Sequence, residues 1–200
     1  RYGAKSLRSW IMRFHSQTAG VTLTAQQPMN NIVRVAYQAL AAVLGGTQSL
    51  HTNSMDETLA LPTEEAVQVA LRTQQVLAYE TGIPNVIDPL GGSYYIESLT
   101  DQLEREAESL FEEIDAIGGV VQGLEQGWFQ RKIAESAARQ QWEIEQHRRA
   151  IVGVNEFVTN EPELTIPTLK VGADAENSQR EAMAKMRQTR DNAGCVESLE

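Results

Sequence analysis

The chain contains few of the residues from which disulfide-bonded, thiolate-zinc or membrane proteins are built. Its one cysteine, Cys195, excludes an internal disulfide and a zinc site made of several thiolates. No apolar run approaches the ~20 residues needed to cross a bilayer, and the segment Arg1–Lys5 does not look like a signal peptide. We therefore expect a cytoplasmic protein that does not enter a membrane.

Short catalytic motifs are also missing. The sequence has no H-E-x-x-H metal motif, no G-x-S-x-G nucleophile turn, no G-x-G-x-x-G and no G-x-x-x-x-G-K-[ST] phosphate loop. With 17 basic and 27 acidic residues the formal net charge is −10. A negative surface repels phosphate backbones and anionic headgroups, so nucleic acid and membrane surfaces are disfavoured as partners.

What is present is an alternation of short extended runs with amphipathic helices. Glycines such as Gly82 mark helix ends, while Asn30 or Asn31 and Thr63 are candidate helix caps. The periodicity predicts buried stripes that include Val33 and Leu103. We expect strands at 11–15, 47–52 and 85–88 and an edge strand at 151–155. We expect helices at 30–44, 62–81, 98–117 and 120–147, an extended linker at 159–173, and a surface helix or frayed tail at 174–193.

Three consecutive strand–helix units predict an α/β fold with a parallel sheet, either open or closed into a barrel. A complete eight-unit barrel needs about 250 residues, so this chain holds only part of one. In both architectures the working residues lie in loops after the carboxyl ends of strands. The loops to search are therefore 15–22, 51–61 and 88–95.

Polar residues gather in and beside these loops. Period-two alternation places Arg13, His15 and Gln17 on one side of their strand. Such groups at a barrel mouth bind carbonyls, ribose hydroxyls or phosphates, whereas the plainer alternative is a strand-end cap or a buried hydrogen-bond network. The other members of the set are Gln48, His51, Asn53, Asp56, Glu57 and Asp88.

Seven segments carry a resemblance to a known family. In order they are 13–20 (RFHSQTAG), 30–34 (NNIVR), 46–53 (GTQSLHTN), 56–57 (DE), 61–63 (LPT), 88–94 (DPLGGSY) and 151–155 (IVGVN). They closely resemble the large catalytic subunit of methylmalonyl-CoA mutase and its acyl-CoA mutase relatives. The resemblance covers residues 1–158, and the tail beyond residue 170 is a looser match.

The resemblance implies the C-terminal portion of a TIM barrel over residues 1–158, followed by a linker and polar tail over 159–200. Such barrels bind acyl-CoA along their axis and face adenosylcobalamin at their mouth. The implied reaction is a radical carbon-skeleton rearrangement of the methylmalonyl-CoA to succinyl-CoA type. The cofactor supplies the difficult chemistry, and the protein supplies position and hydrogen bonds.

The same resemblance assigns residue roles. A carboxylate at Glu57 suits ribose hydroxyls, and Gly20 lets a corrin ring approach the backbone. A cation and neutral donors near the substrate suit an anionic, carbonyl-bearing thioester. The implied cofactor-binding residues are Gln17, Gly20, Val21, Glu57, Thr58 and Ala60, and the implied substrate-binding residues are Arg13, His15 and Gln48.

Some features depart from the family pattern. Val21 and Thr58 stand where methylmalonyl-CoA mutases often carry Trp and Ala, and the segment 26–29 (QQPM) looks closer to isobutyryl-CoA-type or separate-subunit mutases. The family's catalytic histidine belongs upstream, so no catalytic residue is assigned here. There is no D-x-H-x-x-G of a cobalamin-binding domain, which is expected downstream or on a small subunit, in a dimer or heterodimer.

We therefore expect part of an acyl-CoA mutase catalytic subunit that is inactive by itself. A degenerate, non-catalytic partner subunit is the alternative. An aldolase-like or hydrolytic barrel would require a Schiff-base lysine or metal ligands at a strand exit. Lys5, Lys132, Lys170 and Lys185 all lie outside the exit loops.

Overall fold

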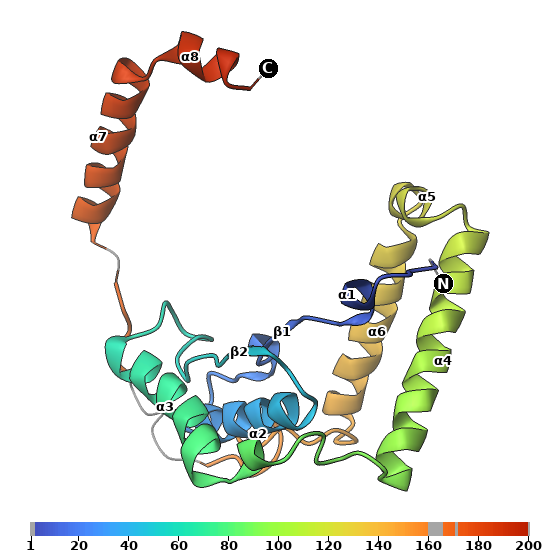
Figure 1. Ribbon diagram of the computed structural model, residues 1–200. Coiled ribbons are helices and arrows are strands. Elements are labelled where there is room, and N and C mark those ends of the chain that lie inside the picture. The colour runs from blue at the N-terminus through green and yellow to red at the C-terminus, as the bar shows by residue number, and fades with distance from the viewer. Residues whose placement is uncertain (1–2, 160–165, 171, 200) are drawn as a thin grey trace.

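A small parallel sheet organises the first half of the chain. The computed structural model describes residues 3–159, 166–170 and 172–199. Strand β1 (His15–Gln17) pairs with β2 (Ser49–His51), with His15 opposite Ser49. Helix α2 (Asn30–Leu44) connects the two strands, and α3 (Glu64–Glu80) follows β2 and packs against α2 (Figure 1). Both strands therefore direct their carboxyl ends to the same edge of the sheet.

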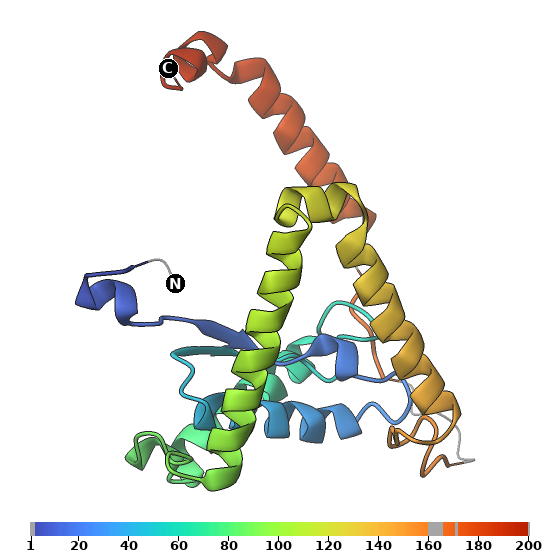
Figure 2. The same cartoon turned by 90° about the vertical axis from the view of Figure 1, so that its right-hand side faces the viewer.

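The second half of the chain is helical. Helices α4 and α6 meet at the short α5 and diverge toward their other ends, and α7 and α8 project away from the sheet (Figure 2). Within the described residues, no helix is both long enough and apolar enough to span a bilayer. The remaining elements are α1 (Leu7–Trp10), the 3-10 helices η1 (Gly20–Thr22) and η2 (Ile83–Asn85), α4 (Tyr94–Ala116), α5 (Val120–Glu125), α6 (Trp128–Glu145), α7 (Ala173–Thr189) and α8 (Asn192–Glu197).

The apolar core is small and lies around the sheet. The chain exposes 15896 Å², against about 9,400 Å² for a compact monomer of this mass. Large apolar side chains are therefore exposed over much of the molecule. The buried apolar residues are Leu23, Val35, Ala39, Ala66 and Ala70.

The predicted parallel pairing of the first two strands is confirmed, although β1 begins at the last residue of the predicted strand 11–15. The third predicted strand, 85–88, is wrong: η2 ends at Asn85, and bends follow. Ile87 is 97% exposed, and Asp88 has a φ of 49°, outside the extended region. A strand needs a neighbour for its backbone hydrogen bonds, and in the described residues this segment has none. The predicted edge strand 151–155 is reduced to an isolated bridge between Val152 and Glu156.

The predicted helices are confirmed, with shifted ends. The segment 120–147 forms two helices, because Gly127 adopts a φ of 67° between α5 and α6. The Thr63 side chain caps α3 by accepting a hydrogen bond from the Ala66 N–H. The expected cap on α2 is wrong, since Met29 is its N-cap residue and has no side-chain cap bond. The tail forms helix α7, whereas residues 160–165 and 171 of the predicted linker lie outside the described residues.

The predicted buried stripes are partly wrong. Val33 is 54% exposed, because α2 instead buries Asn31, Val35 and Ala39. Leu103 is 58% exposed, and α4 contains no buried residue. The amphipathic pattern correctly predicts helix, but the apolar face of α4 is left largely uncovered.

Candidate functional site

The exits of the two strands lie side by side. The Thr18 N–H donates to the His51 carbonyl at 3.1 Å, which continues the strand pairing one step past β1. Residues 18–24 form the first exit loop, and residues 52–60 form the second. Because the strands are parallel, both loops leave the same edge of the sheet.

Asn53 joins the two exit loops. Its side chain is 2% exposed, and its Oδ1 accepts from the Thr18 hydroxyl at 3.0 Å and from Gln17 Nε2 at 3.3 Å. The Asn53 N–H in turn donates to Thr18 Oγ1 at 2.9 Å. This reciprocal bonding fixes the end of β1 against the start of the second exit loop.

Gly20 permits the loops to approach closely. A Cβ atom at this position would lie 2.6 Å from Glu57 Oε1 and 2.8 Å from Asn53 Nδ2. Any larger side chain would therefore displace the carboxylate and the amide. The structure gives this glycine a role that was not predicted, which is to seat Glu57 and Asn53 against the backbone of the first exit loop.

Three buried polar atoms at the start of the second exit loop lack a hydrogen-bond partner among the described residues. They are Asn53 Nδ2, Ser54 Oγ and Asp56 Oδ1. The other Asp56 oxygen accepts from the Thr63 N–H at 2.8 Å. Unpaired buried polar groups are costly and uncommon, so a cluster within four residues marks a candidate ligand site.

A pocket of about 240 Å³ opens beside this cluster, between the second exit loop and α3. Its lining combines an imidazole, two hydroxyls, an amide and a carboxylate with apolar side chains, which is a composition typical of small-molecule sites. Its lining residues are His51, Thr52, Ser54, Glu57, Pro62, Val67, Ala70, Leu71 and Gln74.

The structure brings together three of the six residues predicted to bind the cofactor. Gln17 bonds to Asn53, and both Asn53 and Glu57 lie against Gly20. Val21 is 95% exposed and Thr58 is exposed, whereas Ala60 is half-buried.

The three residues predicted to bind substrate lie at the opposite end of the strand pair. Gln48 Oε1 accepts from the Phe14 N–H at 2.8 Å, and its Nε2 donates to the Met12 carbonyl at 3.1 Å. His15 Nδ1 lies 2.8 Å from Ser49 Oγ. Gln48 and His15 are exposed, so these contacts do not form the buried hydrogen-bond network of the plainer alternative, and Arg13 is exposed just before β1.

Thr18 and Ser54 were missed by sequence reasoning, and Asn53 and Asp56 were recognised only as loop polar groups. The sequence feature that could have indicated them is the segment Thr52–Asp56, in which four of five residues are polar and which directly follows a strand. The sequence does not reveal their burial, because burial depends on the contact between the two loops.

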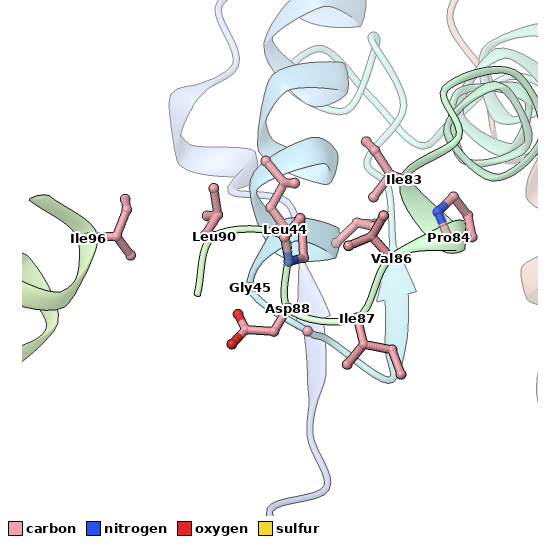
Figure 3. A pocket seen from close by; sticks show the side chains of 12 residues that line it. Leu44, Gly45, Ile83, Pro84, Val86, Ile87, Asp88, Leu90 and Ile96 are labelled. Atoms are coloured by element: carbon pink, nitrogen blue, oxygen red, sulfur yellow. The ribbon is translucent and has the colours of Figure 1, made fainter. Parts of the chain in front are cut away.

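A second cavity, of about 510 Å³, lies at the amino-terminal edge of the sheet (Figure 3). It is formed by the end of α2, the segment 83–90 and Ile96, and Asp88 is the one charged residue in its lining. Asp88 was expected beside the other polar loop residues, but the structure places it here. Because working residues lie after the carboxyl ends of parallel strands in open α/β sheets and in barrels alike, we assign the site to the exit loops.

Comparison with protein families matches residues 1–200 to the family described as Methylmalonyl-CoA mutase. The match covers the whole chain. The chain belongs to the methylmalonyl-CoA mutase family.

Individual relatives agree with this family. The chain is 46% identical over 193 residues to the 2-hydroxyisobutanoyl-CoA mutase large subunit of Aquincola tertiaricarbonis, covering 96% of this chain and 34% of the relative. It is 44% identical over 200 residues to methylmalonyl-CoA mutase of Cereibacter sphaeroides (100% and 28%). It is 42% identical over 198 residues to methylmalonyl-CoA mutase of Escherichia coli (99% and 28%). The chain thus spans about a third or less of the length of these mutases.

Proposed function

We propose that this chain is part of the catalytic subunit of a cobalamin-dependent acyl-CoA mutase. The observation that carries the proposal is the cluster of unpaired buried polar atoms at the strand exits, directly beside Glu57 and Gly20. Family membership supplies the reaction class, an intramolecular carbon-skeleton rearrangement.

Adenosylcobalamin fits the polar groups of the exit loops. When bound, it supplies the radical chemistry of the family reaction. Gln17 and Glu57 present an amide and a carboxylate that suit hydroxyl-bearing groups of the cofactor, and Asn53 Nδ2 has an unused donor. Gly20 keeps the carboxylate against the loop backbone, so the donors and acceptors are held in place before binding. Val21, Thr58 and Ala60 complete the proposed contact set.

Acyl-CoA is the proposed substrate, with contacts at Arg13, His15 and Gln48. The guanidinium of Arg13 is exposed and suits an anionic group, while Gln48 keeps its strand in position. The 2-hydroxyisobutanoyl-CoA mutase relative supports a branched acyl group as one candidate substrate.

The proposed architecture is the C-terminal part of a TIM barrel over 1–158, followed by a linker and tail over 159–200. Two parallel strands, short exit loops and a large exposed apolar area support a segment that packs against further barrel units. A cobalamin-binding domain or small subunit is the proposed partner in a dimer or heterodimer, in keeping with relatives named large subunits. The free Cys195 fits the reducing cytoplasm.

The test is Glu57→Gln in the full-length subunit, with Glu112→Gln on exposed α4 as the matched control. Loss of a charged acceptor should weaken adenosylcobalamin affinity about tenfold or more, measured by absorbance titration, with the acyl-CoA KM unchanged. Equal cofactor affinity in the two variants would contradict the proposed site. The isolated chain should give no acyl-CoA turnover, and turnover would contradict its assignment as a part of the catalytic unit.

A further inference from the structure

One face of α2 is polar and points toward the exit loops. Asn31, Arg34 and Gln38 follow the i, i+3, i+7 spacing that places side chains on one side of a helix. We call these three residues the polar face of α2. A helix that connects two parallel strands is expected to pack apolar side chains against the sheet. The polar face of α2 instead forms hydrogen bonds with the exit loops, and this difference requires an explanation.

Asn31 uses the full hydrogen-bond capacity of its amide. It is 0% exposed, and its Nδ2 donates to the carbonyls of Thr24 and Met55, both at 2.9 Å. Its Oδ1 accepts from the Thr24 N–H at 3.1 Å and from Arg34 Nη1 at 2.8 Å. One side chain therefore holds the first and second exit loops at a fixed separation.

Gln38 holds the start of the first exit loop. Its Oε1 accepts from the Ala19 N–H at 2.6 Å, and its Nε2 donates to Thr22 Oγ1 at 2.7 Å. These two contacts bracket η1, which contains Gly20 and Val21. Gln38 and Asn31 together fix both ends of the loop.

Arg34 adds a third segment. Its Nη1 donates to Thr24 Oγ1 at 3.0 Å as well as to Asn31, and its Nη2 donates to the Val152 carbonyl at 2.8 Å. These acceptors are uncharged oxygens at three separate places in the sequence. A planar guanidinium suits such fixed, divergent geometry, whereas a lysine ammonium does not.

The segment that Arg34 contacts, residues 151–157, is itself rigidly held. Asn155 Oδ1 accepts from the Ile151 N–H at 2.7 Å, and Asn155 Nδ2 donates to the carbonyls of Ile144 and Arg149. Gln27 Nε2 donates to the Phe157 carbonyl at 3.1 Å. The C-terminal helical part of the chain is thus anchored at the base of the exit loops.

We propose that the polar face of α2 is a positioning element for the cofactor site: it sets the spacing of the two exit loops and couples that spacing to residues 151–157. This inference rests on the proposed function, which places the cofactor contacts in these loops. Asn31, Arg34 and Gln38 are positioning residues, because their contacts are to loop backbone and neighbouring side chains. Their effect reaches the ligand through Gly20 and Glu57.

The experiment uses Arg34→Lys and Gln38→Glu in the full-length subunit with its cobalamin-binding partner. Arg72→Lys and Gln68→Glu on the exposed side of α3 are the matched controls. Each variant is measured for adenosylcobalamin Kd, kcat, the KM for methylmalonyl-CoA and for 2-hydroxyisobutanoyl-CoA, and Tm. Gln38→Glu changes contacts separate from those of Arg34 and so provides a test even where Arg34→Lys fails to fold.

We expect both test variants to raise the cofactor Kd about tenfold and to lower kcat, with KM within about twofold of the controls and Tm close to theirs. An unchanged Kd and kcat would overturn the inference. So would Kd, KM and Tm changing together, since that is the signature of a merely structural role. If Glu57→Gln also leaves Kd unchanged, the proposed function itself fails; if it weakens binding while the α2 variants do not, only this inference fails.

Discussion

Residues 13–80 and residues 94–199 use their side chains in opposite ways. In the described residues, every buried side chain lies between Thr18 and Ala70. In the second region the apolar face of each long helix is open to solvent, as Leu103 and Ile133 show with 58% and 69% exposure. The first region is held by hydrogen bonds between segments far apart in the sequence, whereas the second is held by contacts within helices and between neighbouring ones, such as the Lys132–Glu113 ion pair between α6 and α4.

The two regions differ in what determines their structure. The loops at the strand exits need a defined geometry, and buried amides such as Asn31 and Asn53 provide it with few apolar residues. In the second region, local helix propensity and glycines at the helix ends define the helices without a buried core of their own. Substitutions of one residue type in both regions should therefore have unequal effects, and each pair below measures that inequality in the full-length subunit.

The largest difference is expected for Asn31→Leu against Asn177→Leu. The first leaves the part-buried carbonyls of Thr24 and Met55 and the Thr24 N–H without their partner and should lower the free energy of unfolding by about 3 kcal/mol. The second lies on exposed α7 and should change it by less than about 0.5 kcal/mol. Urea unfolding provides the measurement, and equal losses would remove the distinction between the regions.

A packing pair comes next. Ala39 is 0% exposed, whereas Ala182 is exposed on α7. Ala39→Leu should cost about 2 kcal/mol by overpacking, and Ala182→Leu should be neutral. Thermal unfolding by circular dichroism compares them. A neutral Ala39→Leu would mean that the core around α2 is loosely packed.

A glycine pair addresses the site itself. Gly20→Ala pushes on Glu57 and Asn53, whereas a Cβ atom at Gly172 would meet nothing within 4 Å. We expect Gly20→Ala to weaken adenosylcobalamin binding about tenfold and Gly172→Ala to leave it unchanged, by absorbance titration. Unchanged adenosylcobalamin affinity in Gly20→Ala would show that Glu57 and Asn53 can move away from the new methyl group without weakening the site.

The smallest effect belongs to the second region. Lys132 Nζ lies 3.1 Å from Glu113 Oε2, and both side chains are 47% exposed. Lys132→Ala should lower the free energy of unfolding by no more than about 0.5 kcal/mol, and 1 M salt should remove even that difference. A larger loss in urea unfolding would mean that the α4–α6 contact contributes more stability than an exposed ion pair does.

Local chemistry explains which elements could be predicted from the sequence. Thr63 and the glycines near helix ends indicated helix limits, and alternation indicated β1 and β2. The strand at 85–88 failed because a strand is completed by its neighbour, and no neighbour in the described residues pairs with it. Asn31 failed as a cap for a related reason: its amide is used by Thr24 and Met55, which are neighbours only in the folded chain.

In the candidate site, too, some residues could be predicted from the sequence, whereas others depend on contacts formed only in the folded chain. Gln17, Gly20 and Glu57 were predicted through family resemblance, and the structure brings them together. Asn53, which joins them, was not assigned a role, because nothing in a sequence distinguishes a buried loop asparagine from an exposed one. Burial and reciprocal bonding are properties of the contact between the two loops.

The Gln48 side chain carries a consequence for how the sheet avoids misalignment. With one amide it accepts from the Phe14 N–H and donates to the Met12 carbonyl, groups two residues apart in the segment that leads into β1. Sliding that strand by one residue would place these backbone groups on the wrong face and break both bonds. Two strands of three residues have little backbone pairing to select an alignment, so the Gln48 bonds before the strands act together with the Thr18–Asn53 bonds after them to hold a single register.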